Sequence, residues 1–282
     1  MTMVDAAAYL RRIGVAGPVR ADLRTLAHLQ ERHQKSVPFE TIDFNLGLPI
    51  GMGEEAVEKI VDRRRGGGCY ELNTAFAVLL RELGFPVALL PGRTLHNGQR
   101  EVLGAHSGHM MLRVEADGES WLTDVGFRWA SRHPLRLSDR RPQKDENGEY
   151  LLTDGDEGDV VIVHNGVPRI RLETREREIE DFVPTLWWFC TSPDSPVSAG
   201  SVWASLVTDD GRISLLDRTL TRVENGQLVR EVLDDEAFPA ACRRWFGIEL
   251  DRLPHLPPGR PTSPRERRPP RPVPTTQESG RQ

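Results

Sequence analysis

The first part of the chain carries apolar side chains at intervals of three or four residues, which is the period of an α-helix. This pattern predicts two helices between residues 6 and 35, separated by a stretch with two glycines and a proline at 14–18. A shorter helix is predicted over 54–65, and a helix of about four turns over 69–83, where a glycine follows as a stop signal. We therefore predict a helical domain over residues 1–85.

From residue 86 the apolar period changes to two, which is typical of strands with one buried face. Short strands separated by Gly, Asp and Asn turns are predicted at 87–90, 110–114, 121–125 and 160–163. This spacing predicts an antiparallel sheet or a small barrel over residues 86–190.

The C-terminal part of the chain mixes both periods. Apolar alternation near 213–216 and 228–232 predicts two strands, and a helical pattern predicts a helix over 234–246. The aromatic run 187–189 is expected to pack at a junction between domains. The composition of residues 254–282 shifts to Pro, Arg, Thr and Ser with few apolar side chains, which predicts a disordered tail.

Charge and composition narrow the classes of function. The net charge is −5, and the tail carries six arginines against two glutamates, which leaves −9 on the rest of the chain. A body this acidic argues against nucleic acid as a partner. No apolar run approaches the about 20 residues that span a bilayer, and the N-terminus lacks the features of a signal peptide, so we expect a cytoplasmic protein without a membrane partner. The three cysteines form no CxxC pair, which argues against a disulfide framework and against a zinc site.

One of these cysteines is a candidate nucleophile. Gly66, Gly67 and Gly68 run directly into Cys69, which falls in the first turn of a predicted helix. The unpaired N–H groups and the positive end of the helix dipole at such a position favour a thiolate over a thiol. The glycines let the backbone turn sharply and leave the sulfur approachable, and their N–H groups are candidates for stabilising an oxyanion or contacting a coenzyme. The alternative interpretation is a buried, inert cysteine.

A predicted hairpin over 109–125 brings a histidine and an aspartate together. Its turn contains Asp117-Gly118, a pair suited to a two-residue type I′ connection. With that turn, Asp124 lies opposite Met111 and diagonal to His109, on one face of the sheet. A diagonal gap of about 7–8 Å is within reach of a His and an Asp side chain. A turn longer or shorter by one residue would send Asp124 to the other face.

A thiolate beside an imidazole that a carboxylate orients is the arrangement needed for nucleophilic acyl transfer. In this interpretation Cys69 attacks a thioester carbonyl, His109 shuttles the proton, and Asp124 fixes the tautomer of the histidine. The rival histidine is His106 in a glycine-rich loop, and the rival role of Asp124 is to cap the turn before Gly126. The other histidines considered, which we expect at the surface, are His28, His33 and His96.

The motifs around these residues resemble the signature of the arylamine N-acetyltransferase family. They are Arg65-Gly66-Gly67-x-Cys69-x-Glu71-x-Asn73, His109-Met110, Asp124-Val125-Gly126-Phe127, Val37-Pro38-Phe39-Glu40, the run from Trp187 to Ser195, and Arg218-Thr219-Leu220. The resemblance covers roughly residues 5 to 250, which is nearly the whole body of the chain.

The resemblance implies an α+β fold related to cysteine proteases and transglutaminases. Its parts would be a helical first domain, an antiparallel β-barrel over 86–190, and an α/β lid domain over 191–253. It implies no bound cofactor. Acetyl-CoA would be the co-substrate of a ping-pong cycle that ends on a small-molecule arylamine, hydrazine or arylhydroxylamine. Carried over by residue, Cys69 would be the nucleophile, His109 the base and Asp124 the orienting acid. The acceptor pocket would be lined by Phe39 and Phe127.

Three positions depart from the family pattern. Gly68 stands where a bulky aromatic residue usually precedes the cysteine, which predicts a lower wall and a larger substrate pocket beside the sulfur. Thr41 replaces the usual Asn, and Arg128 the usual Gly, near the acceptor side.

These departures keep a second function open. Ansamycin amide synthases resemble the same family, keep its triad, and take their acyl group from the acyl carrier of a polyketide synthase. Two further classes stay open: a cysteine hydrolase that uses water as the acceptor, and a non-catalytic binding protein without a reactive thiol.

Overall fold

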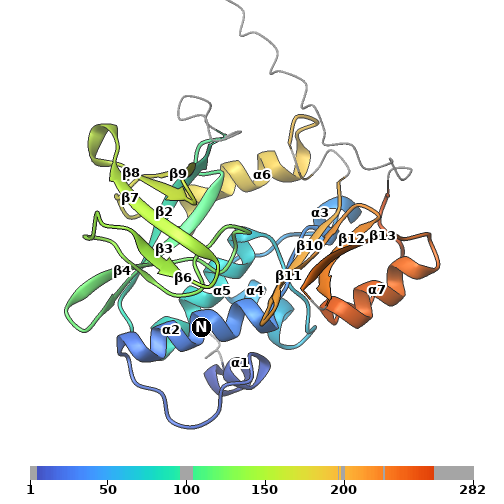
Figure 1. Cartoon of the computed structure of the whole chain (residues 1–282), viewed down its shortest axis with the longest axis horizontal. Coiled ribbons are helices and arrows are strands. Elements are labelled where there is room, and N and C mark those ends of the chain that lie inside the picture. The colour runs from blue at the N-terminus through green and yellow to red at the C-terminus, as the bar shows by residue number, and fades with distance from the viewer. Residues whose placement is uncertain (1–4, 96–103, 196, 198–200, 225, 257–282) are drawn as a thin grey trace, which may run out of the picture.

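The computed structural model describes residues 5–95, 104–195, 197, 201–224 and 226–256 (Figure 1). Most of the tail predicted to be disordered, from residue 257 on, lies outside the described residues. No helix within the described ranges is long and apolar enough to cross a membrane.

The N-terminal region is helical, as predicted. Its helices are α1 (Ala6–Arg12), α2 (Leu23–Ser36), α3 (Ile42–Leu46), α4 (Glu54–Val61) and α5 (Cys69–Glu82). Helix α2 begins at Leu23, because the carboxylate of Asp22 caps it by accepting a hydrogen bond from the N–H of Thr25 at 2.8 Å. Helix α4 ends earlier than the predicted residue 65, and Arg64 adopts a left-handed backbone conformation with φ 54°.

The middle region forms an eight-stranded antiparallel sheet that curls into a nearly closed barrel (Figure 1). Along the sheet the strand order is β5-β4-β3-β2-β9-β8-β7-β6. The strands are β2 (Val87–Thr94), β3 (His109–Ala116), β4 (Glu119–Thr123), β5 (Leu135–Arg136), β6 (Gln143–Asp145), β7 (Gly148–Asp154), β8 (Val160–His164) and β9 (Val167–Leu172), with a 3₁₀ turn at Asp156–Gly158. The four predicted strands are confirmed, and the predicted α+β class with its antiparallel barrel is confirmed with them.

A second antiparallel sheet has the order β1-β10-β11-β12-β13. Its strands are β1 (Phe39–Glu40), β10 (Trp203–Thr208), β11 (Gly211–Leu216), β12 (Thr219–Glu224) and β13 (Gln227–Val232), and helix α7 (Ala237–Phe246) follows them. Strand β1 lies far from the others in the chain, yet Phe39 pairs with Ser205. The domain boundaries stay predictions, and this pairing links residues on both sides of them.

Helix α5 is the centre of the main hydrophobic core. Its apolar side chains are almost fully buried and pack against the other N-terminal helices and the barrel strands. The fully buried ones include Leu72, Ala75, Phe76, Leu79 and Leu80. Because each large apolar side chain contributes about 1.5–3 kcal/mol when buried, the first turn of α5 has a firmly fixed position.

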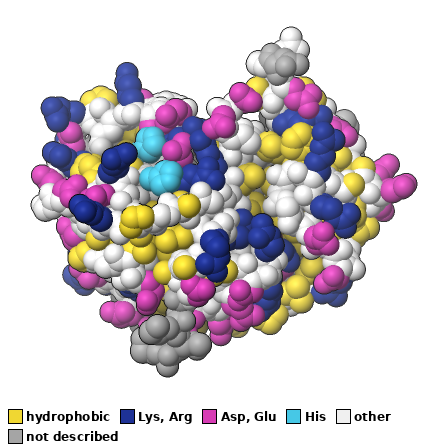
Figure 2. All heavy atoms as spheres, turned by 90° about the horizontal axis from the view of Figure 1, so that it is seen from below, with side chains coloured by type: hydrophobic (Ala, Val, Ile, Leu, Met, Phe, Trp, Pro, Cys, Tyr) yellow, Lys and Arg dark blue, Asp and Glu magenta, His cyan; other side chains and the backbone are white. Residues whose placement is uncertain are grey.

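The aromatic run 187–189 lies in α6 (Val183–Thr191), which follows a 3₁₀ turn at Ile179–Phe182. The expectation that this run packs inside a junction is wrong for Trp187, which is 67% exposed. Phe182 is buried instead, with its ring centroid 5.4 Å from that of Tyr70. Seen from below the view of Figure 1, acidic and basic side chains are interspersed over the surface (Figure 2).

Candidate active site

The start of α5 places Cys69, which is half-buried, at the first helical residue, with Gly68 as the N-cap. The glycines before it are required by close packing. A Cβ atom at Gly66 would lie 1.9 Å from the carbonyl oxygen of Pro38, and one at Gly67 would lie 2.7 Å from Oε2 of Glu71. The loop therefore rests directly on backbone and side chains that a larger residue would displace.

Two N–H groups of the glycine run are already engaged. Gly67 N–H donates to Pro38 O at 3.3 Å, and Gly68 N–H donates to Oε2 of Glu71 at 2.9 Å. The prediction that these groups stabilise an oxyanion or contact a coenzyme is therefore wrong for both.

A buried network of charges lies behind this loop. Lys59 Nζ is 2.7 Å from Glu71 Oε1 and 2.8 Å from Asp43 Oδ2. Arg65 Nη2 is 2.6 Å from Glu40 Oε1 and 2.8 Å from Asp43 Oδ1. Two cations thus face three carboxylates, and burial raises the pKa of Glu71 to about 7 against the pull of Lys59. Since Glu71 also caps Gly68, the network fixes the backbone that carries Cys69.

The hairpin of β3 and β4 has the predicted register. Leu112 pairs with Thr123, and Asp117 and Gly118 take left-handed φ angles of 52° and 78°, as a type I′ turn requires. His109 opens β3 and Asp124 directly follows β4, so both lie on one face. The distance from His109 Nε2 to Asp124 Oδ2 is 2.7 Å, and both side chains are buried. The predicted juxtaposition is confirmed.

Asn73 holds the carboxylate in place. Its Nδ2 donates to Asp124 Oδ1 at 2.9 Å and to Met110 O at 2.8 Å, and its Oδ1 accepts from Val125 N–H at 3.0 Å. Asn73 lies four residues after Cys69, on the same face of α5. The motif around Cys69 contains Asn73 without indicating its role, although a spacing of four residues from the cysteine predicts a shared helix face.

Electrostatics favour a protonated His109. Burial lowers its pKa, but the charge of Asp124, the hydrogen bond to that carboxylate and the hydrogen bond with Cys69 outweigh burial and raise the pKa to about 10. Because Nε2 is bonded to Asp124, Nδ1 is the ring nitrogen left for the Cys69 sulfur. The Phe127 ring lies 4.9 Å from the His109 ring, centroid to centroid.

Gly126 brings the loop after β4 against the cysteine. A Cβ atom at this position would lie 2.7 Å from Cys69 Cα and 2.9 Å from Asn73 Nδ2. Only glycine allows this approach without a shift of one of the two backbones.

The remaining predicted pocket residues have mixed outcomes. Phe39 is half-buried on β1 and packs against the main core. The larger pocket expected beside Gly68 stays a prediction; Phe44 packs there, with its Cε2 3.1 Å from where a Cβ atom of residue 68 would be. Thr41 is buried and exchanges two hydrogen bonds of 3.0 Å with the backbone of Trp203, so this departure from the family pattern serves the pairing of β1 with β10.

The structure also distinguishes His109 from the other candidate histidines. His106 is exposed and contacts Arg93, at 3.3 Å between Nε2 and Nη1, so His109 and not its rival meets Asp124. His33 was expected at the surface but is buried, with Nε2 3.0 Å from the hydroxyl of Tyr9. His96 lies outside the described residues. Within the described part of the chain, no group of three His, Cys, Asp or Glu side chains could hold a metal ion.

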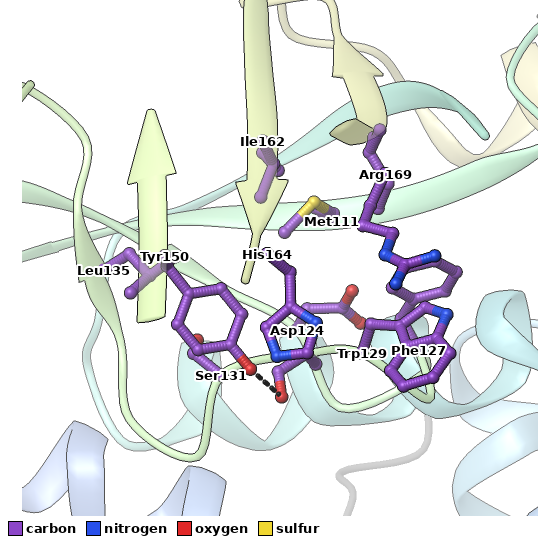
Figure 3. Close-up of a pocket in the computed structure, with 12 residues that line it drawn as sticks. Met111, Asp124, Phe127, Trp129, Ser131, Leu135, Tyr150, Ile162, His164 and Arg169 are labelled. Atoms are coloured by element: carbon purple, nitrogen blue, oxygen red, sulfur yellow. Dashed lines mark hydrogen bonds between the residues drawn. The ribbon is translucent and has the colours of Figure 1, made fainter. Parts of the chain in front are cut away.

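A small pocket beside the site is lined by residues of the barrel strands and of the loop after β4 (Figure 3). Asp124, Phe127, Trp129, Tyr150 and His164 are among the residues that line it, with Phe127 and Trp129 at the right of the view and Tyr150 at the left. The tyrosine and histidine rings stack with their centroids 4.8 Å apart.

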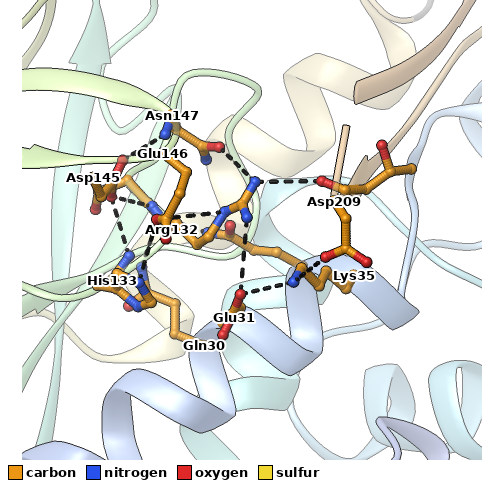
Figure 4. A network of polar contacts seen from close by, with 12 residues as sticks. Gln30, Glu31, Lys35, Arg132, His133, Asp145, Glu146, Asn147 and Asp209 are labelled. Carbon is orange, nitrogen blue, oxygen red and sulfur yellow. Dashed lines mark hydrogen bonds and ion pairs between the residues drawn. The ribbon is translucent and has the colours of Figure 1, made fainter. Parts of the chain in front are cut away.

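A polar network ties the loop of the pocket to two other parts of the chain (Figure 4). Arg132 Nη1 lies 3.9 Å from Glu31 Oε1 of α2, and Arg132 Nη2 donates to Thr208 O of β10 at 3.4 Å. Lys35 Nζ bridges Glu31 and Asp209 at 2.8 and 2.7 Å. The network thereby sets how the helices, the barrel loop and the second sheet meet.

The sequence matches the N-acetyltransferase family over residues 22–254. An arylamine N-acetyltransferase from Mycolicibacterium smegmatis is 34% identical over 260 residues, which cover 89% of this chain and 94% of that protein. Proansamycin X synthase from Amycolatopsis mediterranei is 30% identical over 260 residues, which cover 86% of this chain and 97% of that protein.

Solved structures agree with the sequence matches. The arylamine N-acetyl transferase of M. smegmatis has a TM-score of 0.80 at 34% identity, covering 87% of this chain and 93% of that one. The Mycobacterium marinum arylamine N-acetyltransferase, solved in complex with CoA, has a TM-score of 0.78 at 30% identity, covering 86% of this chain and 93% of that one.

Proposed function

Because the chain belongs to the arylamine N-acetyltransferase family, we propose that it moves an acetyl group from acetyl-CoA to an arylamine or hydrazine through a thioester on Cys69. The observation that carries this proposal is the contact of Cys69 with His109, which is itself 2.7 Å from Asp124. The CoA complex of the M. marinum relative supports the choice of donor.

In the first half of the cycle, His109 holds the proton of the Cys69 thiol and leaves a thiolate. The sulfur attacks the carbonyl carbon of acetyl-CoA, and the electron pair of the C=O bond moves to oxygen. When the carbonyl re-forms, the bond from carbon to the CoA sulfur breaks. The CoA thiolate then takes the proton from His109, and acetyl-Cys69 remains.

In the second half, the acceptor amine attacks the carbonyl carbon of acetyl-Cys69. His109 takes a proton from the amine nitrogen, the bond from carbon to the Cys69 sulfur breaks, and the amide leaves. Asp124 keeps Nε2 of His109 occupied throughout, so that Nδ1 exchanges the proton. Phe127, whose ring lies 4.9 Å from that of His109, would contact the aromatic ring of the acceptor, with Phe39 and Gly68 as the other proposed walls.

Initial-rate kinetics test this proposal. Release of CoA thiol is measured while the concentrations of acetyl-CoA and an aromatic amine are both varied. A ping-pong cycle gives parallel double-reciprocal lines. We expect Cys69→Ala to lose the activity and Cys190→Ala, which removes an exposed cysteine, to keep it. An unchanged rate in Cys69→Ala would refute the thioester mechanism.

A second candidate function rests on the similarity to proansamycin X synthase. The same three residues would then take an acyl chain from a polyketide synthase carrier and form an amide with an amine of that chain. This function predicts no CoA release with acetyl-CoA and a simple amine. It also predicts amide formation from a long acyl thioester that bears an aromatic amine.

A further inference from the structure

Tyr70, the residue after the proposed nucleophile, is tied to the turn that leads into His109. Its hydroxyl donates a hydrogen bond to the carbonyl oxygen of Ser107, two residues before the histidine. The side chain is 2% exposed, and its ring centroid lies 5.4 Å from that of Phe182 and 6.0 Å from that of Phe189. Because close packing fixes the ring, the hydrogen bond joins two well-placed parts of the protein.

The same turn is held by two further side chains. Thr185 of α6 donates through its hydroxyl to His106 O at 2.9 Å. Arg93 of β2 donates to Gly104 O through Nε and Nη2, at 3.1 and 3.0 Å. Ser107 takes a left-handed backbone conformation with φ 50°, which is uncommon for residues other than glycine and persists where the surroundings impose it. Side chains of α5, α6 and β2 therefore set the shape of this turn.

Helix α5 holds the backbone on both sides of His109. Asn73 Nδ2 donates to Met110 O, directly after the histidine, at 2.8 Å, and Tyr70 donates to Ser107 O before it. The two side chains are three residues apart, so they are neighbours on the surface of one helix. Since His109 is the first residue of β3, strand pairing continues on one side of it only, and the turn fixes the other. The helix that begins at the nucleophile thus positions the histidine.

The hydroxyl of Tyr70 keeps its proton and remains a donor. Burial raises the pKa of Tyr70 above its ordinary value, and the negative charge of Cys69 acts in the same direction. A phenylalanine at this position would keep the ring and lose only the hydrogen bond. Such a change isolates the effect of the hydroxyl from that of the packing around it.

We propose that Tyr70 is a positioning residue whose hydroxyl keeps His109 where its Nδ1 meets the sulfur of Cys69. Thr185 gives the same turn a second support. This inference rests on the proposed function. Tyr70 acts through the histidine and not on the coenzyme or the amine. Without the hydroxyl the turn relaxes, and the histidine holds the thiol proton for a smaller fraction of the time.

Alkylation of Cys69 by iodoacetamide tests this proposal without any acetyl transfer. We expect Tyr70→Phe to react about tenfold more slowly than wild type at pH 6, where His109 must hold the proton for the sulfur to be a thiolate. At pH 10 an unassisted thiol is itself ionised, and the two rates should agree. Peptide mass spectrometry identifies the alkylated residue, because Cys190 is also exposed.

Matched variants separate positioning from a general loss of stability. Tyr9→Phe is the control for Tyr70→Phe, because the buried hydroxyl of Tyr9 also forms a hydrogen bond, of 3.0 Å with His33. Thr185→Val removes the second support, and we expect it to slow alkylation about threefold at pH 6. Thr191→Val is its control, since the Thr191 hydroxyl donates within α6, to Trp187 O at 2.8 Å. Both controls should react at the wild-type rate.

Transfer from acetyl-CoA to an aromatic amine gives a second readout, and we expect Tyr70→Phe to lower kcat/KM for acetyl-CoA about tenfold at pH 6. Equal losses at pH 6 and pH 10, or a loss that Tyr9→Phe reproduces, would overturn the proposal, because the hydroxyl would then support only the fold. Wild-type rates in both Tyr70→Phe and Thr185→Val would overturn it as well. If wild type transfers no acetyl group while alkylation still depends on Tyr70, the proposed function alone is refuted.

Discussion

Two groups of cations lie near the proposed nucleophile, and they differ in their counter-charges. Lys59 and Arg65, behind the loop before Cys69, contact carboxylates at 2.6–2.8 Å. Arg169 and Arg212, beyond Gly126, form no ion pair among the described residues. The first group holds the backbone before Cys69, and each of its cations is paired with carboxylates inside the protein. The arginines of the second group are half-buried, and their charge is not paired with a carboxylate among the described residues.

The largest effect should follow from removing a cation from the paired group. Lys59→Met leaves Glu71 buried without its cation and Asp43 with Arg65 alone, and removing one partner of a buried pair costs about 3–5 kcal/mol. Urea unfolding at neutral pH measures this loss in the free energy of unfolding. Arg212→Gln is the matched comparison, because it strands no carboxylate, and we expect its free energy of unfolding to stay near that of wild type. A Lys59→Met protein as stable as wild type would contradict the contrast between the groups.

A smaller effect should appear in the dependence of stability on pH. The pKa of His109 is raised from 6.5 to about 10 in the folded protein. Its contribution is therefore fully present below pH 6.5 and is lost as pH rises through 10. We expect the free energy of unfolding of wild type to exceed that of Asp124→Asn by a few kcal/mol at pH 6, and the gap to shrink by pH 10. A gap that is constant from pH 6 to 10 would count against the charged pair.

Asn73 should affect the reactivity of Cys69 by holding the Asp124 carboxylate in place, because the amide itself carries no charge. Asn73→Ala removes a donor to Asp124 and leaves Met110 O without that bond, which corresponds to about 1–3 kcal/mol. We expect slower alkylation of Cys69 by iodoacetamide at neutral pH, in a protein that remains folded by circular dichroism. Asn45→Ala, at an exposed contact with His255, should alkylate at the wild-type rate. An unchanged rate in Asn73→Ala would show that Asp124 keeps its place without this amide.

The smallest effect on stability is expected for an ion pair that is exposed to solvent. Arg63 and Glu58 are 2.7 Å apart, but both side chains are more than half exposed. We expect Arg63→Gln to change the free energy of unfolding by less than about 0.5 kcal/mol. If Arg63→Gln lost as much free energy of unfolding as Lys59→Met, the presence of an ion pair, and not its burial, would decide the size of the effect.

Local patterns were enough to predict part of the site. The approach of His109 to Asp124 could be predicted because a two-residue turn fixes the register of one hairpin. The place of Cys69 followed from a helix start marked by glycines. Both features depend on neighbours in the sequence.

Other features depend on distant partners, and the sequence pattern does not reveal them. Strand β1 is two residues long and finds its partner Ser205 only in the folded chain. Phe44 fills the space beside Gly68 because of how α3 packs. The charge networks join residues with no shared period. Their members look like ordinary surface charges until the fold buries them.

The central claim is that Cys69 carries the acetyl group. Intact mass spectrometry after brief mixing with acetyl-CoA, without any amine, tests it most directly. We predict one added acetyl group on wild type and on Cys190→Ala, and none on Cys69→Ala. An acetyl group retained on Cys69→Ala, or none on a wild-type protein whose Cys69 still alkylates rapidly, would contradict the account.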